Sequence, residues 1–154
     1  MTTDTNHFTL TRDYPLPPEK MWHLMTDADM RSKWGAPEEG MILEVTANDL
    51  QVDGIEWHRC GPAENPEFEV ETRWMRLDGP EHAVFTEMIQ AGGARLGASL
   101  VTYRITADGS GSKVDIAVSA SSFVGEGITE EIMQGWQGGI ANLDKLVAEQ
   151  AANY

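Results

Sequence analysis

Apolar and polar residues alternate with a period of two along most of the chain, and the spacing becomes helical in shorter segments. Residues 7–14 alternate, with Phe8 and Leu10 on one face, and Pro15 follows directly. This pattern predicts a half-buried strand that ends where proline cannot join a strand ladder. Six further alternating segments lie between residues 41 and 121. The strands predicted there are 41–47, 51–60, 67–77, 83–90, 98–107 and 113–120.

The segments that separate these six strands are short and rich in turn-forming residues. Examples are Gly92-Gly93 and the run from Asp108 to Ser112. Antiparallel neighbours can be joined by turns of this length, whereas parallel strands need a long crossover connection. We therefore expect one curved antiparallel sheet.

Two short helices are expected between the first strand and the second. Pro18 suits the first turn of a helix, where its missing N–H leaves no hydrogen bond unmade. Thr26 is the expected N-cap of the second helix, because Asp29 stands three residues later in the position of a capping box. We expect Gly35-Ala-Pro37 to stop this second helix.

A long C-terminal helix is predicted from residue 128 onward, with Thr129 as its expected cap. The helix contains Gly135, Gly138 and Gly139, and each glycine costs about 1 kcal/mol of helix stability relative to alanine. Without side chains, these positions would let the backbone approach either the sheet or a guest molecule closely. The apolar stripe of the helix consists of Ile128, Ile132, Trp136, Ile140, Leu143 and Val147.

The order of the elements favours an α+β architecture, because a long amphipathic helix must bury its apolar stripe along a sheet. A curved sheet can wrap partly around such a helix, and the space between them can leave a cavity. The sequence contains no internal repeat and no low-complexity linker. We therefore expect a single domain over residues 1–154.

Motifs near both ends of the chain resemble one known family. Leu16-Pro-Pro-Glu-Lys-Met-Trp22 is followed by Thr26-Asp27 and by Trp34-Gly-Ala-Pro37, and Gly135-Trp136-Gln-Gly138-Gly-Ile140-Ala-Asn-Leu143 stands near the other end. Together these segments look like the AHSA1-like (activator of Hsp90 ATPase homologue-like) family of the START/Bet v 1-like (SRPBCC) superfamily.

This resemblance spans about residues 8–147, and it implies the helix-grip fold. In that fold one strand, two helices, six strands and a helix follow one another, and the sheet grips the C-terminal helix around a hydrophobic cavity. One departure concerns Phe85-Thr86-Glu87, which falls where the family often has Phe-Thr-Trp. A carboxylate there replaces a large apolar group, so no ligand of a relative is carried over to this chain.

Charge and cysteine content narrow the choice of partners and compartment. The chain has 11 lysine and arginine residues against 25 aspartate and glutamate residues, a net charge of −14. This acidity argues against nucleic acid and against anionic membrane surfaces. Neither a secretory signal nor an apolar run long enough for membrane insertion is present, and the single Cys60 fits a reducing cytoplasm. We expect no metal and no cofactor.

Strand alternation decides which side chains would line the cavity. If Trp57 faces inward, then Ile55 and Arg59 do as well. If Phe85 faces inward, so does Glu87. An inward arginine and glutamate could pair or bind the polar end of an apolar guest; alternatively, both lie near strand ends and reach water. The candidate cavity residues are Ile55, Trp57, Arg59, Trp74, Phe85, Glu87, Val101, Tyr103, Ile116, Ile132, Met133, Trp136 and Ile140.

The aromatic and histidine residues admit plainer interpretations. Tyr103 and Trp136 either wall a pocket or fill the core. His58 alternates oppositely to Trp57 and is therefore expected to face outward. No histidine has an evident acid or base partner, and no familiar catalytic motif is present, so we assign no catalytic residue.

Three functions remain as hypotheses. The favoured one is a non-enzymatic protein that binds a small hydrophobic or amphipathic molecule. The alternative is a cavity enzyme, like the cyclases and hydrolases of the wider superfamily, that uses Glu87, Arg59 and Tyr103. An Hsp90-type co-chaperone is not favoured, because those proteins have a further N-terminal chaperone-binding domain and this chain starts with the first strand. The sequence leaves a homodimer open.

Overall fold

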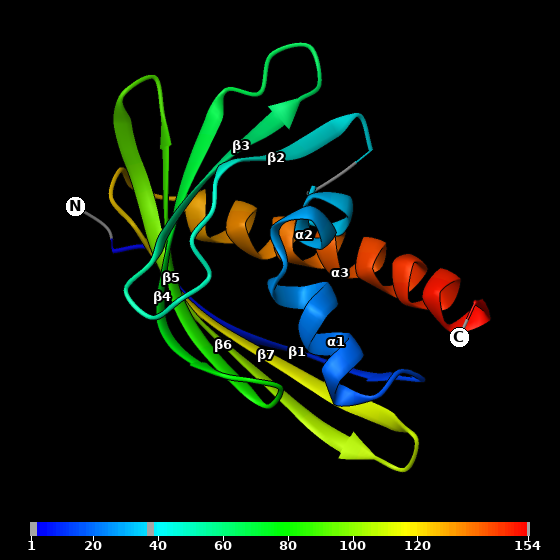
Figure 1. The fold of residues 1–154 in the computed structure, drawn as a ribbon. Coiled ribbons are helices and arrows are strands. Elements are labelled where there is room, and N and C mark those ends of the chain that lie inside the picture. The colour runs from blue at the N-terminus through cyan, green and yellow to red at the C-terminus, as the bar shows by residue number, and fades with distance from the viewer. Residues whose placement is uncertain (1–2, 37–38, 154) are drawn as a thin grey trace.

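Seven strands and three helices make up the described part of the chain, in the order expected from the sequence (Figure 1). The structure is a computed structural model that describes residues 3–36 and 39–153. The second helix ends at Trp34, directly before the expected stop at Gly35, while Pro37 lies outside these residues. The strands are β1 Thr5–Tyr14, β2 Met41–Ala47, β3 Ile55–Pro62, β4 Phe68–Asp78, β5 His82–Ala91, β6 Ala94–Asp108 and β7 Gly111–Ser122. The helices are α1 Pro18–Thr26, α2 Ala28–Trp34 and α3 Ile128–Ala152.

The strands form one antiparallel sheet in the order β1-β7-β6-β5-β4-β3-β2. Neighbours from β2 to β7 are also neighbours in the chain, because short turns join them. β1 instead pairs with β7, and Leu10 stands opposite Ile116. This arrangement confirms the expected curved sheet and the helix-grip fold.

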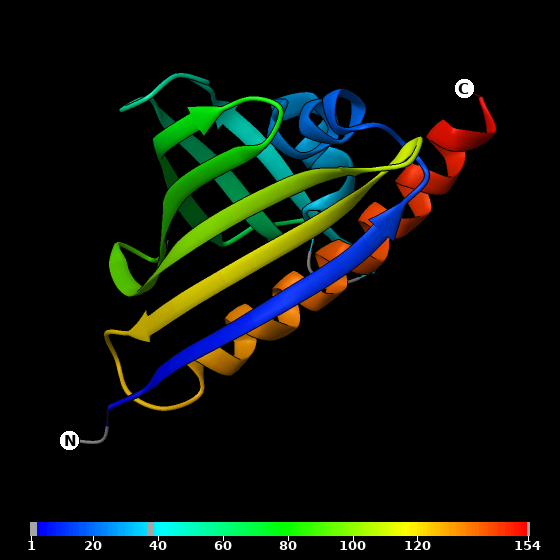
Figure 2. The same ribbon diagram turned by 90° about the horizontal axis from the view of Figure 1, so that it is seen from below.

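Helix α3 lies along the concave face of the sheet, where its apolar stripe is buried. Figure 2 shows α3 running beside β1 and β7, and in Figure 1 it passes between β1 on one side and β2 on the other. Ile140, Leu143 and Val147 of α3 are buried, as are Ile116 and Val118 of β7. No helix in the described part of the chain is long and apolar enough to cross a membrane.

Helix α2 packs against α3, whereas α1 packs against α2 and strands β6 and β7. The Trp34 indole N–H donates a hydrogen bond to the Leu24 carbonyl at 2.8 Å, which ties α2 to α1. At Gly139 of α3, an added Cβ would lie 3.4 Å from the Trp34 carbonyl oxygen. This glycine therefore allows a close approach to helix α2, which was neither of the two alternatives expected from the sequence, although Gly139 also lines a cavity.

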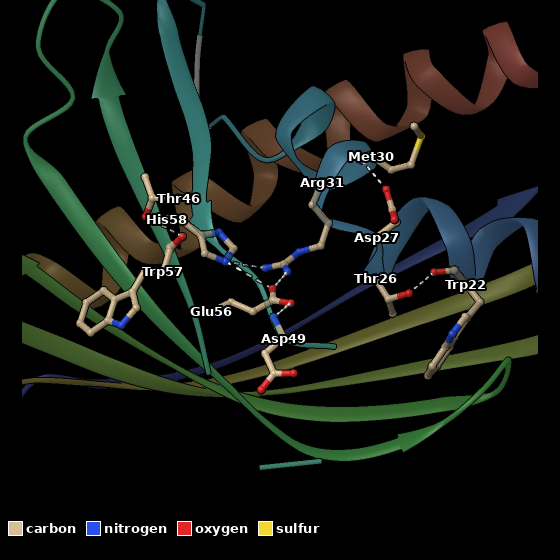
Figure 3. A network of polar contacts seen from close by, with 10 residues as sticks. All are labelled: Trp22, Thr26, Asp27, Met30, Arg31, Thr46, Asp49, Glu56, Trp57 and His58. Carbon is tan, nitrogen blue, oxygen red and sulfur yellow. Dashed lines mark hydrogen bonds and ion pairs between the residues drawn. The ribbon is translucent and has the colours of Figure 1, made fainter. Parts of the chain in front are cut away.

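Both expected helix caps are wrong. Asp27 caps α2 by accepting a hydrogen bond from the Met30 N–H at 3.1 Å (Figure 3), whereas the Thr26 hydroxyl donates back to the Trp22 carbonyl. Helix α3 begins after Gly127, not at a Thr129 cap. The side chain of Asp4, from the other end of the chain, accepts hydrogen bonds from the Thr129 N–H and hydroxyl.

Candidate functional site

A cavity of about 600 Å³ lies between the concave face of the sheet, helix α2 and the N-terminal half of α3. Most of its lining residues are apolar, and the exposed residues Glu131 and Gln134 are among them, so the cavity reaches solvent beside α3. Its lining consists of Arg31, Trp34, Gly35, Met41, Leu43, His58, Cys60, Phe68, Val70, Phe85, Glu87, Ile89, Leu96, Tyr103, Ile128, Glu131, Ile132, Gln134, Gly135, Trp136 and Gly139.

A row of aromatic rings crosses this part of the molecule. The ring centroids of Trp34 and Trp136 lie 6.5 Å apart, and those of Trp136 and Tyr103 lie 6.4 Å apart. The row continues to Phe85 at 5.0 Å and from there to Trp74 at 4.9 Å. Tilted and edge-to-face pairs at these distances attract each other beyond their burial, so the row forms a firm aromatic wall.

A buried group of three polar side chains adjoins the cavity (Figure 3). Arg31 reaches from α2 to Glu56 of β3, and its Nη1 lies 2.6 Å from the carboxylate. The other Arg31 nitrogen, Nη2, lies 3.4 Å from Nε2 of His58. The second carboxylate oxygen of Glu56 accepts a hydrogen bond from the Asp49 N–H at 3.3 Å. Strand alternation places Glu56 and His58 on the same inward face.

These contacts fix the protonation of the group. Burial raises the pKa of Glu56, but the contact with His58 and the charge of Arg31 outweigh burial and bring this pKa down to about 2. Burial and the charge of Arg31 lower the pKa of His58, against the opposing effect of Glu56. At neutral pH the group therefore contains one cation, one anion and one neutral imidazole.

Glu87 is the carboxyl that faces the cavity itself. Its strand neighbours Phe85 and Ile89, two residues to either side, also line the cavity. Its cross-strand neighbours, Thr72 of β4 and Ser99 of β6, are both buried. Burial raises the pKa of Glu87, and the charge of Arg31 only partly opposes this effect.

The thiol of Cys60 and the phenol of Tyr103, which also line the cavity, stay protonated at neutral pH. Burial raises the pKa of the Cys60 thiol to about 11, with a contribution from the negative charge of Glu87. Burial also raises the pKa of the Tyr103 phenol. Cys60 is therefore not a thiolate nucleophile at neutral pH.

Only some of the cavity residues predicted from the sequence line the cavity, and the others lie elsewhere in the structure. Met133 is half-buried outside the lining, and its sulfur accepts a hydrogen bond from the Asn6 amide at 3.9 Å. The candidates that line the cavity are Phe85, Glu87, Tyr103, Ile132 and Trp136. The candidates that are buried in the core without lining it are Trp74, Val101, Ile116 and Ile140.

Three candidates of strand β3 were placed on the wrong face. Ile55 is 40% exposed, and Arg59 is exposed and donates to the Pro66 carbonyl at 3.3 Å. Figure 3 shows Trp57 pointing away from the Arg31 group. His58, expected to face outward, is buried with 1% of its surface exposed.

The reason is that Arg31 compensates the charge of Glu56, so this strand can turn its polar face inward. The combination of Glu87, Arg59 and Tyr103, on which the enzyme hypothesis relied, is therefore not assembled. Sequence reasoning missed Arg31 and Glu56. The alternation of β3 fits burial of either face, so it does not single out Glu56. Only the contact with Arg31, which comes from another segment of the chain, decides which face is buried.

A second, larger hollow lies on the outside of the molecule between α2, β2 and α3. Its volume is about 1000 Å³, and its lining mixes apolar residues with charged ones such as Lys33, Glu44 and Lys145. None of its lining residues is buried. Within residues 3–36 and 39–153, no cluster of three or more His, Cys, Asp or Glu side chains is arranged to hold a metal ion. The enclosed cavity is thus the stronger candidate site.

Comparisons with known proteins agree with the fold. Residues 15–148 match the family model described as Activator of Hsp90 ATPase homolog 1-like protein. No curated protein sequence matches the chain.

Solved structures with the same fold are similar over nearly their whole length. The Mll3558 protein from Rhizobium loti has a TM-score of 0.80 and 23% identity, over 93% of this chain and 97% of that one. Protein CV1439 from Chromobacterium violaceum has a TM-score of 0.80 and 23% identity, over 92% and 96%. Ara h 8.0201 has a TM-score of 0.71 and 15% identity, over 95% and 99%. At these identities the likeness shows the fold alone.

Proposed function

Since this chain belongs to the Activator of Hsp90 ATPase homolog 1-like family and encloses a cavity under its long helix, we propose that it binds a small, mainly apolar molecule there. The observation that carries the proposal is the cavity of about 600 Å³. Protein interiors are otherwise close-packed, with few voids larger than a water molecule. Pockets of roughly 300–1,000 Å³ are typical of small-molecule sites.

The lining determines what kind of molecule fits. Apolar side chains such as Leu43, Ile89 and Leu96 surround most of the space, and the rings of Tyr103 and Trp136 add flat surfaces. Apolar burial would supply most of the binding free energy, at roughly 25 cal/mol per Å². The few polar groups of the lining would fix the orientation of the guest.

Chaperone activation, to which the family description refers, is not part of this proposal. The observations that support the binding proposal concern the cavity and its lining residues. Such a cavity suits a small guest molecule rather than the surface of another protein. Catalysis is not part of the proposal either, because Arg59 lies on the opposite face of the sheet from Glu87.

Filling the cavity with a larger side chain tests the proposal. In Leu96→Trp, the indole would occupy space that the guest needs. We expect this variant to bind the neutral dye N-phenyl-1-naphthylamine about ten-fold more weakly than the unmodified protein, a loss of about 1.4 kcal/mol. Dye fluorescence during titration with protein measures the affinity.

The matched control is Leu100→Trp, the same substitution on the same strand at a side chain that is 49% exposed. We expect this control to bind the dye as the unmodified protein does. Ile89→Trp, on the neighbouring strand, is a second filling variant in case Leu96→Trp does not fold, as judged by circular dichroism. Dye binding that survives both filling variants, or that is equally reduced in the control, would contradict the proposal.

A further inference from the structure

Glu87 is a carboxyl group without a protein partner inside the cavity. Among the described residues, it makes no hydrogen bond and no ion pair. The Thr72 hydroxyl, directly across the strand pair from Glu87, is buried and has no hydrogen-bond partner within the described part of the chain. Glu87 lines the cavity and Thr72 does not, so the half-buried Glu87 carboxyl is the group that a guest can reach. A carboxyl group that faces a cavity without a protein partner points to a guest that supplies one.

Arg31 is not a hydrogen-bond or ion-pair partner of Glu87. It is the cation that faces Glu87 within the cavity, but its guanidinium already contacts Glu56 at 2.6 Å and His58 at 3.4 Å. Its positive charge is balanced by the Glu56 carboxylate, with which it forms a buried pair. An anionic guest would therefore find no free cation to bind.

The remaining charge of the lining is acidic. Glu131, an exposed residue of α3, adds a second carboxylate where the cavity meets solvent. His58 is neutral, because burial lowers its pKa. The rings of Phe85 and Tyr103 also line the cavity, and the π face of an aromatic ring, though not its edge, attracts a cation. The potential in the cavity thus attracts positive charge and repels negative charge.

We infer that the guest is an apolar molecule with a single cationic amine, and that the Glu87 carboxylate binds this amine. The inference rests on the proposed function and specifies its ligand class. An ammonium group carries three N–H donors. One can form a charge-assisted hydrogen bond to Glu87, and the positive charge of the amine favours the ionised form of this carboxyl, whose pKa burial raises. Carboxylic acids such as free fatty acids are excluded by the same charges.

Three guests with the same chain and different head groups test the inference. Decylamine, decanol and decanoate each compete with N-phenyl-1-naphthylamine for the cavity at about pH 7.5, where the amine is protonated and the acid is ionised. We expect decylamine to bind about ten-fold more tightly than decanol, and decanoate to bind most weakly. In Glu87→Gln, the advantage of decylamine over decanol should fall to about two-fold or less, while decanol binds as before.

The acidic surface could attract decylamine without any role for the cavity, so a matched control is needed. Glu69→Gln makes the same change of charge at an exposed residue on the outer face of β4. We expect this control to keep the full preference for the amine. Thermal melting checks that Glu87→Gln is folded, and we expect its melting temperature not to fall, because an amide is easier to bury than a carboxylate.

The outcomes separate this inference from the function on which it rests. If decanol binds but decylamine has no advantage, or if Glu87→Gln keeps that advantage, the inference is wrong and the binding function stands. Tighter binding of decanoate than of decylamine would also overturn it. If neither the dye nor any of the three decyl compounds binds, both proposals are wrong.

Discussion

At the scale of single residues, the most constrained group is Glu56, which stays ionised inside the protein. Its two carboxylate oxygens contact Arg31 and the N–H of Asp49, and none of its surface is exposed. A charge in such a place is tolerated only while its partners remain. Removing one partner leaves the other buried and unpaired.

We therefore expect Glu56→Gln to lower the free energy of unfolding by about 3 kcal/mol at neutral pH, because Arg31 loses its counter-charge. Urea denaturation measures this change. Glu44→Gln, at an exposed residue of the adjacent β2, is the matched control and should change stability little. An equal loss in both variants would mean that the buried pair has no special role.

The loss of unfolding free energy in Glu56→Gln should also depend on pH. The folded pKa of Glu56, about 2, lies below the ordinary value of 4.5, so its stabilising contribution is complete above pH 4.5 and is lost as pH falls toward 2. The difference between the unmodified protein and Glu56→Gln should therefore shrink over that window. A difference that stays constant as the solution is acidified would contradict the assignment.

These residues also mark the limit of sequence reasoning at this scale. The alternation around β3 is equally regular on both faces, so Ile55 and Trp57 looked like the buried set. The deciding fact is a contact between Arg31 and Glu56, which are 25 positions apart. For Glu87 the alternation supplied only a condition, an inward position if Phe85 faces inward; Phe85 is buried, and both residues line the cavity.

At the scale of elements, strand and helix positions follow from local pattern, but the ends of helices depend on remote partners. The limits predicted for β2 match the structure, since alternation and turn residues mark them. The cap of α3 comes from Asp4, which is 125 positions from Thr129. Local sequence cannot reveal such a cap, because its donor and acceptor meet only after folding.

The junction between α2 and α3 offers a test at this scale. The Asn142 amide of α3 donates to the carbonyls of Trp34 at 3.3 Å and Ala36 at 3.0 Å, at the end of α2. We expect Asn142→Ala to destabilise the protein by about 1–2 kcal/mol, since these carbonyls lose their donor. Gln137→Ala, at an exposed site on the same helix, should not destabilise it.

Chemical denaturation compares these two variants with the unmodified protein. If Asn142→Ala is as stable as Gln137→Ala, then the amide does not hold α2 against α3. In that case the contacts of Trp34 with Gly139 and with the Trp136 ring would still join the two helices.

At the scale of the whole molecule, the net charge of −14 acts mainly on the outside. Inside, Arg31 and Glu56 balance each other, and Glu87 adds a carboxyl group on the cavity lining. A location in the cytoplasm and the lack of a nucleic-acid partner stay predictions from composition. The mutual repulsion of the outer acids is a direct physical consequence of this charge.

Salt should relieve that repulsion. Raising sodium chloride from about 0.02 M to about 0.5 M shortens the Debye length from roughly 20 Å to roughly 4 Å. We expect the melting temperature at neutral pH to rise by a few degrees over this range. Near pH 4.5, where the net charge is close to zero, the same salt should have little effect. A melting temperature that falls with salt at neutral pH would show that attractive ion pairs dominate instead.

The pairing of β1 with β7 has a consequence for the order in which the protein can fold during synthesis. Thr11 of β1 bonds to Asp115 of β7, 104 positions later in the chain. Strand β1 is therefore synthesised long before β7. It remains unpaired while the strands between them are made and fold into a meander. The hydrogen bond between Asp4 and Thr129 spans 125 positions and can form only later still. Strand β7 and the start of helix α3 thus hold β1 and Asp4 in place only after the intervening strands have been made.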